Sequence, residues 1–219
     1  MKQYPFLYVF FKPFLLSFLR IYYRIELFGK ERFYSKNGAM YSPNHTNAFI
    51  DPIVLACLNQ KKVKFFARSD VFKSPVSRFI LSRFNISPIT RIQEGYSNLK
   101  DNNKTFDLCK GFLRDKEKVI MFPEGICVQE HRIRKLKKGL TRIVFESEVE
   151  HDFNGNVEIV PIGLNYDKAN TFGSKLFINV GDPIEVASYQ QLYKEDKVKA
   201  INTLTRDLEN KMKDITVVV

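Results

Sequence analysis

Cysteine and histidine are scarce in this chain, with three of each among its 219 residues. The cysteines form an odd, widely spaced set that fits neither a disulfide framework nor a paired metal-ligand pattern: Cys57, Cys109 and Cys127. The histidines also lack metal-ligand spacing: His45, His131 and His151. We therefore expect a reducing compartment and no bound metal, and a metallohydrolase is the weakest functional hypothesis.

The sequence also lacks the compositional breaks that commonly separate domains. No run rich in Pro, Gly or Ser divides it, and we find no internal repeat or low-complexity tract. A chain of this length can form one domain with a sizeable core. We expect a single domain at residues 29–219, preceded by an N-terminal segment at residues 1–28.

The N-terminal segment is rich in apolar residues but has no uninterrupted apolar run. Phe, Tyr and Leu fill much of residues 4–23, and Lys12, Arg20 and Arg24 lie within or beside them. A membrane-spanning helix needs about 20 apolar residues without such charges, whereas aromatic and basic residues suit a helix among lipid headgroups. No small-residue cleavage site follows, which argues against a signal peptide. We predict an amphipathic helix at a membrane interface; the alternative is a helix buried in a soluble core.

The net charge of +11 is concentrated in the first half of the chain. Residues 1–100 carry 16 Lys and Arg against 5 Asp and Glu, whereas residues 101–219 carry 19 of each. Nucleic acid and anionic membranes both attract such charge. Because the excess lies in the same half as the aromatic segment, we expect membrane lipids as partners, without nucleic acid or an obligate protein partner. The expected location is peripheral or monotopic, on the cytoplasmic face of a membrane, the inner membrane if bacterial.

Short apolar runs alternate with helical patterns after the N-terminal segment. This order is typical of an α/β fold with a mixed, mostly parallel sheet flanked by helices. Strands are expected at residues 39–41, 63–67, 86–89, 119–122, 157–164 and 176–180. Apolar residues at helical spacing predict helices around residues 72–84, 106–113, 140–144 and 198–215.

The first candidate site is Ser-Pro-Asn-His-Thr-Asn-Ala-Phe-Ile-Asp-Pro at residues 42–52, between a strand and an apolar helical run. A histidine beside a carboxylate can act as a general base, because the carboxylate fixes the imidazole tautomer and stabilises the imidazolium. Positions six apart on one ideal helix point about 120° away from each other. His45 must therefore lie in the turn before the helix if it is to meet Asp51. Alternatively, Asp51 and Pro52 only cap the helix.

The second candidate is an apolar strand that ends in Pro123, Glu124 and Gly125. In open parallel sheets ligands bind at the carboxyl ends of strands. Glu124 can accept hydrogen bonds from substrate hydroxyls there, and Gly125 lets the backbone approach closely. The segment taken alone is also consistent with an ordinary exit from a strand into a loop.

Three weaker signals lie elsewhere in the chain. Arg91 follows a short strand, and its planar guanidinium suits a phosphate. Pro161 interrupts an apolar run, which predicts a sheet edge, a strand start or a bulge. Five Lys and Arg residues at 132–138 could bind a phosphate or the acidic part of an acyl donor, or could form a solvated loop.

Together, four segments in this order and at these intervals resemble the lysophosphatidate and glycerol-3-phosphate acyltransferase superfamily over roughly residues 25–185. His45 and Asp51 look like the family's catalytic pair. By the same resemblance, Arg91 binds the acceptor phosphate, Glu124 and Gly125 help to hold the acceptor, and Pro161 belongs to a block on the acyl side of the site. We add Asn44 and Lys137 as candidate substrate-binding residues.

Two positions depart from the family's usual pattern. Five residues separate His45 from Asp51, where the family usually has four. A similar longer spacing, in an Asn-containing block that ends in Phe-Ile-Asp-Pro, occurs in a eukaryotic glycerol-3-phosphate acyltransferase branch. Residues 126–128 are Ile-Cys-Val, where the family commonly has Thr-Arg-Ser. The missing arginine indicates a different acceptor headgroup, or its charge comes from Arg132, Arg134 or Lys137.

The resemblance implies a phospholipid-biosynthesis enzyme that transfers a fatty acyl group to the hydroxyl of glycerol-3-phosphate or lysophosphatidate. The donor would be a thioester, acyl-CoA or acyl carrier protein, used as a co-substrate, and no metal or redox cofactor is required. His45 would take the hydroxyl proton directly. Two alternatives remain open: an O-acyltransferase for another lysolipid or an amino-acid lipid, and a nonenzymatic basic module that binds membranes or nucleic acid.

Overall fold

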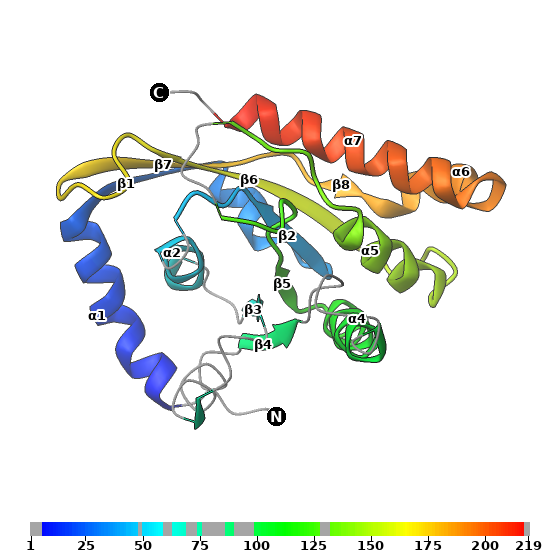
Figure 1. Cartoon of the computed structure of the whole chain (residues 1–219), viewed down its shortest axis with the longest axis horizontal. Coiled ribbons are helices and arrows are strands. Elements are labelled where there is room, and N and C mark those ends of the chain that lie inside the picture. Colours follow the sequence, from blue (N-terminus) through cyan, green and yellow to red (C-terminus); the bar gives the residue numbers. More distant parts are fainter. Residues whose placement is uncertain are drawn as a thin grey trace.

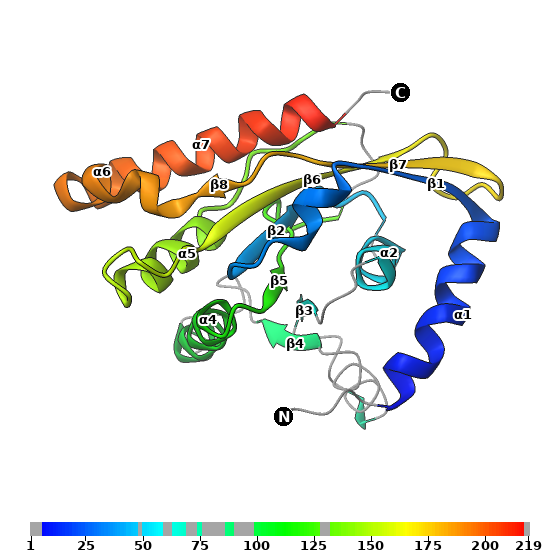
Figure 2. The same ribbon diagram turned by 180° about the vertical axis from the view of Figure 1, so that it is seen from behind.

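The computed structural model describes residues 6–47, 50–58, 63–68, 74–75, 86–89, 99–127 and 132–216. Within these ranges the strands form one mixed sheet, and helices cover both of its faces (Figures 1 and 2). The expected fold class is thereby confirmed. The strands are β1 Tyr23–Phe28, β2 Ala39–Pro43, β3 Val63–Arg68, β4 Ile86–Ile89, β5 Lys118–Ile120, β6 Glu158–Tyr166, β7 Ser174–Val180 and β8 Ile184–Glu185.

Most strands of the sheet run in one direction. The spatial order is β1-β7-β6-β2-β5-β3-β4, and β8 pairs with β6. The strands β2 to β6 are parallel to one another, whereas β1, β7 and β8 run the opposite way. β2 lies between β6 and β5 and is buried at every position. A central strand of this kind needs apolar residues on both faces, which is why residues 39–41 form a continuous apolar run.

The described helices are α1 Phe6–Tyr22, α2 Ile50–Leu58, α4 Leu99–Arg114, α5 Gly139–Val149, α6 Gln190–Glu195 and α7 Lys197–Ile215, with 3₁₀ turns η1 Lys30–Tyr34 and η5 Val186–Tyr189. They divide between two hydrophobic cores, one on each face of the sheet. Alternation along β2 sends Ala39 and Tyr41 into the core with α1 and α2, and Met40 into the core with α4, α5 and α7. Figure 1 shows α7 along the sheet with α5, and α2 between α1 and the central strands.

Pro161 lies inside a central strand, at the point where its neighbour changes. Residues 158–159 of β6 pair with β8, and residues 162–166 pair with β7. Pro161 falls in the gap between these partners, where its missing N–H leaves no ladder bond unmade. Its carbonyl accepts a hydrogen bond from Gly181 N at 2.9 Å. The prediction of a sheet edge, a strand start or a bulge is therefore wrong: Pro161 lies within the nine-residue strand β6, and the break between β7 and β8 accommodates it.

The N-terminal helix α1 buries one face and exposes the other. Leu15, Leu16 and Leu19 pack into the core beside α2, whereas other apolar side chains of the helix face solvent. No helix in the described ranges is long and apolar enough to cross a membrane. The residues after α1, which the sequence assigns to the N-terminal segment, form the edge strand β1 against β7. The boundary between residues 28 and 29 stays a prediction.

The expected strands and helices agree with the described elements, with small shifts at their ends. The strand expected at 119–122 ends at Ile120, because the chain leaves the sheet before Phe122. β1 and β8 were not predicted. The helix expected around residues 72–84 lies almost entirely outside the described residues.

Candidate active site

The first two candidate segments meet at the carboxyl ends of β2 and β5, neighbouring parallel strands in the middle of the sheet. The chain leaves β2 toward α2 on one face and leaves β5 toward α5 on the other. Open α/β sheets form a crevice where successive connections go to opposite faces, and ligands bind there. The site therefore has the position that this architecture favours for a ligand.

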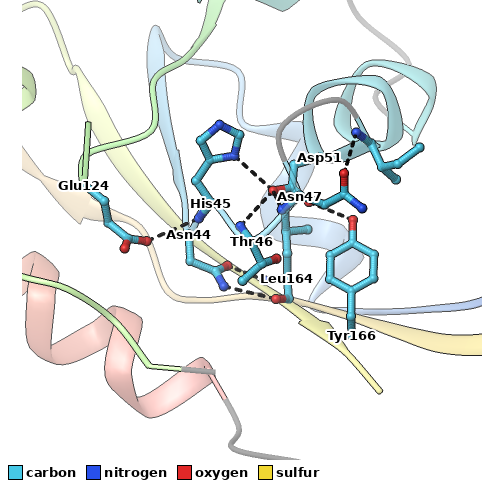
Figure 3. A network of polar contacts seen from close by, with 9 residues as sticks. Asn44, His45, Thr46, Asn47, Asp51, Glu124, Leu164 and Tyr166 are labelled. Atoms are coloured by element: carbon cyan, nitrogen blue, oxygen red, sulfur yellow. Dashed lines mark hydrogen bonds and ion pairs between the residues drawn. The ribbon is translucent and has the colours of Figure 1, made fainter. Parts of the chain in front are cut away.

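Asn44 fixes the loop that follows β2. Its backbone N–H donates to the Ile162 carbonyl at 3.3 Å. Its side-chain Nδ2 donates to the Leu164 carbonyl at 3.0 Å, and its Oδ1 accepts from Leu164 N at 2.6 Å (Figure 3). The amide thus continues the pairing of β2 with β6 by one more residue. Contact between Asn44 and substrate stays a prediction.

His45 and Asp51 lie in direct contact. Nδ1 of His45 is 3.0 Å from Oδ2 of Asp51, and the side chains are 16% and 0% exposed, respectively (Figure 3). His45 precedes α2, whereas Asp51 lies in the first turn of that helix. This is the arrangement that the helix geometry required. Because an ionised carboxylate can only accept, the contact assigns the proton to Nδ1 and leaves the lone pair on Nε2.

The carboxylate of Asp51 accepts hydrogen bonds from three donors besides His45. Oδ2 accepts from the backbone N–H groups of Thr46 at 3.0 Å and Asn47 at 2.8 Å, and Oδ1 accepts from the Tyr166 hydroxyl at 2.7 Å. Asp51 is therefore not a cap preceding the helix, since it points back into the loop. The loop curls around this carboxylate, which explains how the pair meets across five intervening residues.

Phe122 holds the other side of the imidazole. Its ring stacks on His45 with centroids 3.9 Å apart and an interplanar angle of 23°. Phe122 follows β5, so the two neighbouring strand ends supply the two rings. A stacked neighbour restricts rotation of the imidazole about its side-chain torsions.

Glu124 is a buried carboxylate that holds the same loop through a hydrogen bond to its main chain. Its Oε1 accepts from the backbone N–H of His45 at 3.2 Å (Figure 3), and its side chain is also hydrogen bonded by the backbone of Arg134. Burial raises the pKa of Glu124, and the two backbone hydrogen bonds oppose that shift. Figure 3 shows Glu124 and Asp51 on opposite sides of His45.

Gly125 and Lys137 lie next to each other at the exposed side of the site. Gly125 has φ of 72°, a conformation in which other residues are strained. A side-chain carbon at this position would lie 3.5 Å from Cγ of Lys137. The backbone N–H of Lys137 donates to the Pro123 carbonyl at 2.8 Å, which joins the basic loop to the end of β5.

Three further residues that the sequence singled out are Pro161, Arg91 and Cys127. Pro161 pairs in register with Ser42, three residues before His45. Arg91 lies outside the described residues. Cys127 is exposed as a whole residue, but partial desolvation of its thiol, followed by the charges of Asp51 and Glu124, raises the pKa of that thiol. No group of His, Cys, Asp or Glu in the described ranges has the arrangement of a metal site.

Sequence reasoning missed the contacts of two aromatic residues in this site. Phe122 fell within an expected strand and Tyr166 lay two residues beyond one, but neither carried a role of its own. The signal available for both was their position at or just after the end of an expected strand. Their partners lie far away in the sequence, so the contacts depend on strand order.

Comparison with known proteins identifies relatives among lipid acyltransferases. A family model described as Acyltransferase matches residues 24–165. A glycerol-3-phosphate O-acyltransferase 2 of Saccharomyces cerevisiae is 30% identical over 122 residues, which cover 55% of this chain and 16% of the relative. A chloroplastic 1-acyl-sn-glycerol-3-phosphate acyltransferase of Arabidopsis thaliana is 26% identical over 163 residues, covering 74% of this chain and 42% of the relative. The chain thus spans less than half the length of both relatives.

The fold is also found in a solved structure. The crystal structure of the 1-acyl-sn-glycerophosphate acyltransferase PlsC from Thermotoga maritima superposes with a TM-score of 0.60 and 14% sequence identity, covering 97% of this chain and 84% of that chain. At this identity the likeness speaks for the fold alone. The family match covers more than half of the chain, including His45, Asp51 and Glu124. The chain belongs to the Acyltransferase family.

Proposed function

We propose that this chain transfers a fatty acyl group from a thioester donor to the hydroxyl of a glycerol-phosphate acceptor, glycerol-3-phosphate or lysophosphatidate, in phospholipid synthesis. The observation that carries the proposal is the contact between His45 and the buried Asp51 at the carboxyl end of a central strand. The names of the Saccharomyces and Arabidopsis relatives support the acceptor class.

In the proposed mechanism His45 is the general base. With its proton on Nδ1 bound to Asp51, Nε2 takes the proton of the acceptor hydroxyl as that oxygen attacks the thioester carbonyl. Collapse of the tetrahedral intermediate breaks the carbon–sulfur bond. The imidazolium of His45 then gives its proton to the departing thiolate, which leaves as a thiol. The reaction therefore needs no covalent enzyme intermediate and no metal or redox cofactor. General base catalysis contributes about a hundred- to ten-thousandfold.

The acceptor is proposed to bind on the β5 side of His45. Glu124 would receive a glycerol hydroxyl, Gly125 would allow close approach, and the phosphate would bind Arg91 with Lys137 nearby. Lys137 is exposed beside Gly125, which supports a role at the entrance to the site. The acyl-CoA or acyl carrier protein thioester would approach as a co-substrate.

We further propose that α1 docks the enzyme on the cytoplasmic face of a membrane. Phe10, Phe14, Phe18 and Ile21 occupy one face of the helix at i, i+4 and i+3 spacing and are 51–68% exposed. Phe172 lies beside them, with its ring 5.7 Å from that of Tyr22. Exposed apolar patches of this kind mark interaction surfaces, and basic residues near them favour anionic lipid. Arg20 and Arg24 are exposed along the same segment.

A pocket of about 390 Å³ connects this face of α1 with the loop of the site. Phe18 and Tyr22 line it from the helix, Ala169 from the opposite loop, and Asn47 and Ile50 from the start of α2. Asn47 donates to Asp51, so the pocket reaches the groups that hold the base. An apolar chain bound in this pocket would lie against Asn47, two residues after His45 in the sequence.

A related acceptor remains the second candidate. Ile126 and Cys127 occupy exposed positions beyond Gly125, where the family commonly has Thr and Arg. This difference favours testing another lysolipid or an amino-acid lipid. A nonenzymatic membrane- or nucleic-acid-binding module would have no use for the hydrogen bonds that converge on Asp51.

The test is acyl transfer by the detergent-extracted chain with a panel of acceptors and with both CoA and acyl carrier protein thioesters. His45→Ala is expected to lower kcat at least a hundredfold. His151→Ala serves as the control, because the His151 ring is hydrogen bonded to the Ser147 carbonyl at the C-terminal end of α5, outside the site. Acylation that survives in His45→Ala would contradict the mechanism, and a chain inactive with every pair of substrates would contradict the function.

A further inference from the structure

Tyr166 stands at the last position of β6, with its hydroxyl against the catalytic carboxylate. The side chain is 2% exposed, and its O–H donates to Oδ1 of Asp51 at 2.7 Å (Figure 3). The two residues are 115 positions apart in the sequence. A hydroxyl buried this deeply needs a hydrogen-bond partner, and here the partner is the group that orients the base.

The tyrosine ring has little freedom to move. It packs edge-on against Tyr23, with centroids 5.5 Å apart, and the Tyr23 hydroxyl in turn donates to the Ala169 carbonyl. Burial, followed by the negative charge of Asp51 and the hydrogen bond to it, raises the pKa of Tyr166 far above its usual range. The hydroxyl therefore keeps its proton at physiological pH and acts on Asp51 only as a donor.

The two oxygens of Asp51 serve different partners. Oδ2 accepts from His45 and from the loop backbone, whereas Oδ1 accepts from Tyr166. A carboxylate bound through one oxygen alone can turn about its last torsion, and a donor on the second oxygen stops that rotation. The plane of the carboxylate sets the direction in which the imidazole points.

We propose that Tyr166 is a positioning residue for acyl transfer, which holds Asp51 so that His45 presents Nε2 to the acceptor hydroxyl. The inference rests on the proposed function and extends it from a pair to the series Tyr166, Asp51 and His45. In this series β6 supplies the orienting group, α2 the carboxylate and the β2 loop the base.

Tyr166→Phe tests the role, because it removes the hydroxyl and keeps the ring against Tyr23. The matched control is Tyr189→Phe, whose hydroxyl donates to Asp207 at 2.8 Å, outside the site. Both variants lose one hydroxyl-to-carboxylate bond, so both are expected to melt somewhat earlier. Tyr166→Phe is expected to lower kcat about ten- to a hundredfold with KM values within about twofold, and Tyr189→Phe to keep both constants.

The pH profile gives a readout that a packing role would not move. The titratable groups around Asp51 in the described residues are His45, Tyr166, Tyr23 and Cys127. Without the Tyr166 donor, less of the negative charge on Asp51 is satisfied by hydrogen bonds, so the carboxylate attracts positive charge on the neighbouring imidazole more strongly. The acidic limb of the kcat/KM profile is therefore expected to move to higher pH in Tyr166→Phe and to stay in place in Tyr189→Phe.

A double-variant cycle separates positioning from general packing. In an Asp51→Asn background, Tyr166→Phe is expected to cost less than twofold further, since its partner is already changed. Equal losses in both backgrounds, or full activity in Tyr166→Phe, would overturn the inference. Failure of the proposed function is distinguishable, because it appears as an inactive parent chain, whereas failure here leaves the parent chain active and sensitive to His45→Ala.

Discussion

Asp51 and Glu124 are both buried carboxylates, and both hold His45. Asp51 accepts from the imidazole and is 0% exposed, whereas Glu124 accepts from the backbone N–H of the same residue and is 6% exposed. Asp51 comes from the helix after β2, and Glu124 from the loop after β5. The ring and the main chain of one histidine are thus held by separate strand ends. The comparison assigns contact with the imidazole to Asp51 and placement of the loop to Glu124, and acceptor binding by Glu124 remains a proposal.

Among the substitutions that test this division of roles, Asp51→Asn is expected to have the largest effect on kcat. The amide can donate to Nδ1 and thereby favour the wrong tautomer, with the proton on Nε2. We expect kcat to fall about a thousandfold or more, measured in the acyl-transfer assay. Asp207→Asn is the control, since Asp207 also receives a tyrosine hydroxyl but lies outside the site. A fall of less than tenfold in Asp51→Asn would remove Asp51 from the mechanism.

Glu124→Gln is expected to act on substrate binding more than on turnover. The glutamine Oε1 still accepts from His45 N–H, so the loop stays in place, but the negative charge is lost. We expect the acceptor KM to rise about tenfold while kcat changes less than this. Steady-state kinetics with varied acceptor measure the split. If kcat falls as in Asp51→Asn while KM is unchanged, the division of roles between the two carboxylates is wrong.

The smallest effect is expected on thermal stability, in the variant Glu124→Gln. Burial raises the pKa of Glu124 in the folded chain above its ordinary value of 4.5, so ionisation of this group at neutral pH opposes folding. Glu124→Gln should therefore raise Tm at pH 7 by a few degrees. Below the ordinary pKa both states carry the proton, so the difference should vanish. Thermal melts at several pH values check this, and a gain that persists at low pH would contradict it.

Helix geometry set a condition for the contact between His45 and Asp51, and the family resemblance suggested the pair itself. Positions six apart cannot meet on one helix, so His45 had to lie before α2, and it does. Pro161 was predictable as an irregularity, because a missing N–H can be tolerated only at a few places in a sheet. Its position in the middle of the sheet was not, since that depends on where β7 ends and β8 begins.

The contacts of Tyr166 and Phe122 could not be read from the sequence. Each depends on which strands become neighbours, and β6, β2 and β5 come from distant parts of the chain. β1 differs from these, because Tyr23, Ile25 and Leu27 alternate with charged or exposed residues and so carry a strand signal. The strand was not predicted, because residues 23–28 directly follow the aromatic run and were assigned with it to the N-terminal segment. β8 has two residues and no detectable period.

The hydrogen bonds from Asn44 to Leu164 and from Tyr166 to Asp51 also bear on how the site forms during folding. His45 and Asp51 are close in sequence, but these supports join positions 115 to 120 residues apart. Contacts of such long range form late, because the chain entropy of closing the loop must be lost first. A growing chain that has not yet added β6 contains both reactive residues without their alignment. Chemical competence therefore arises together with the completed sheet and disappears with it.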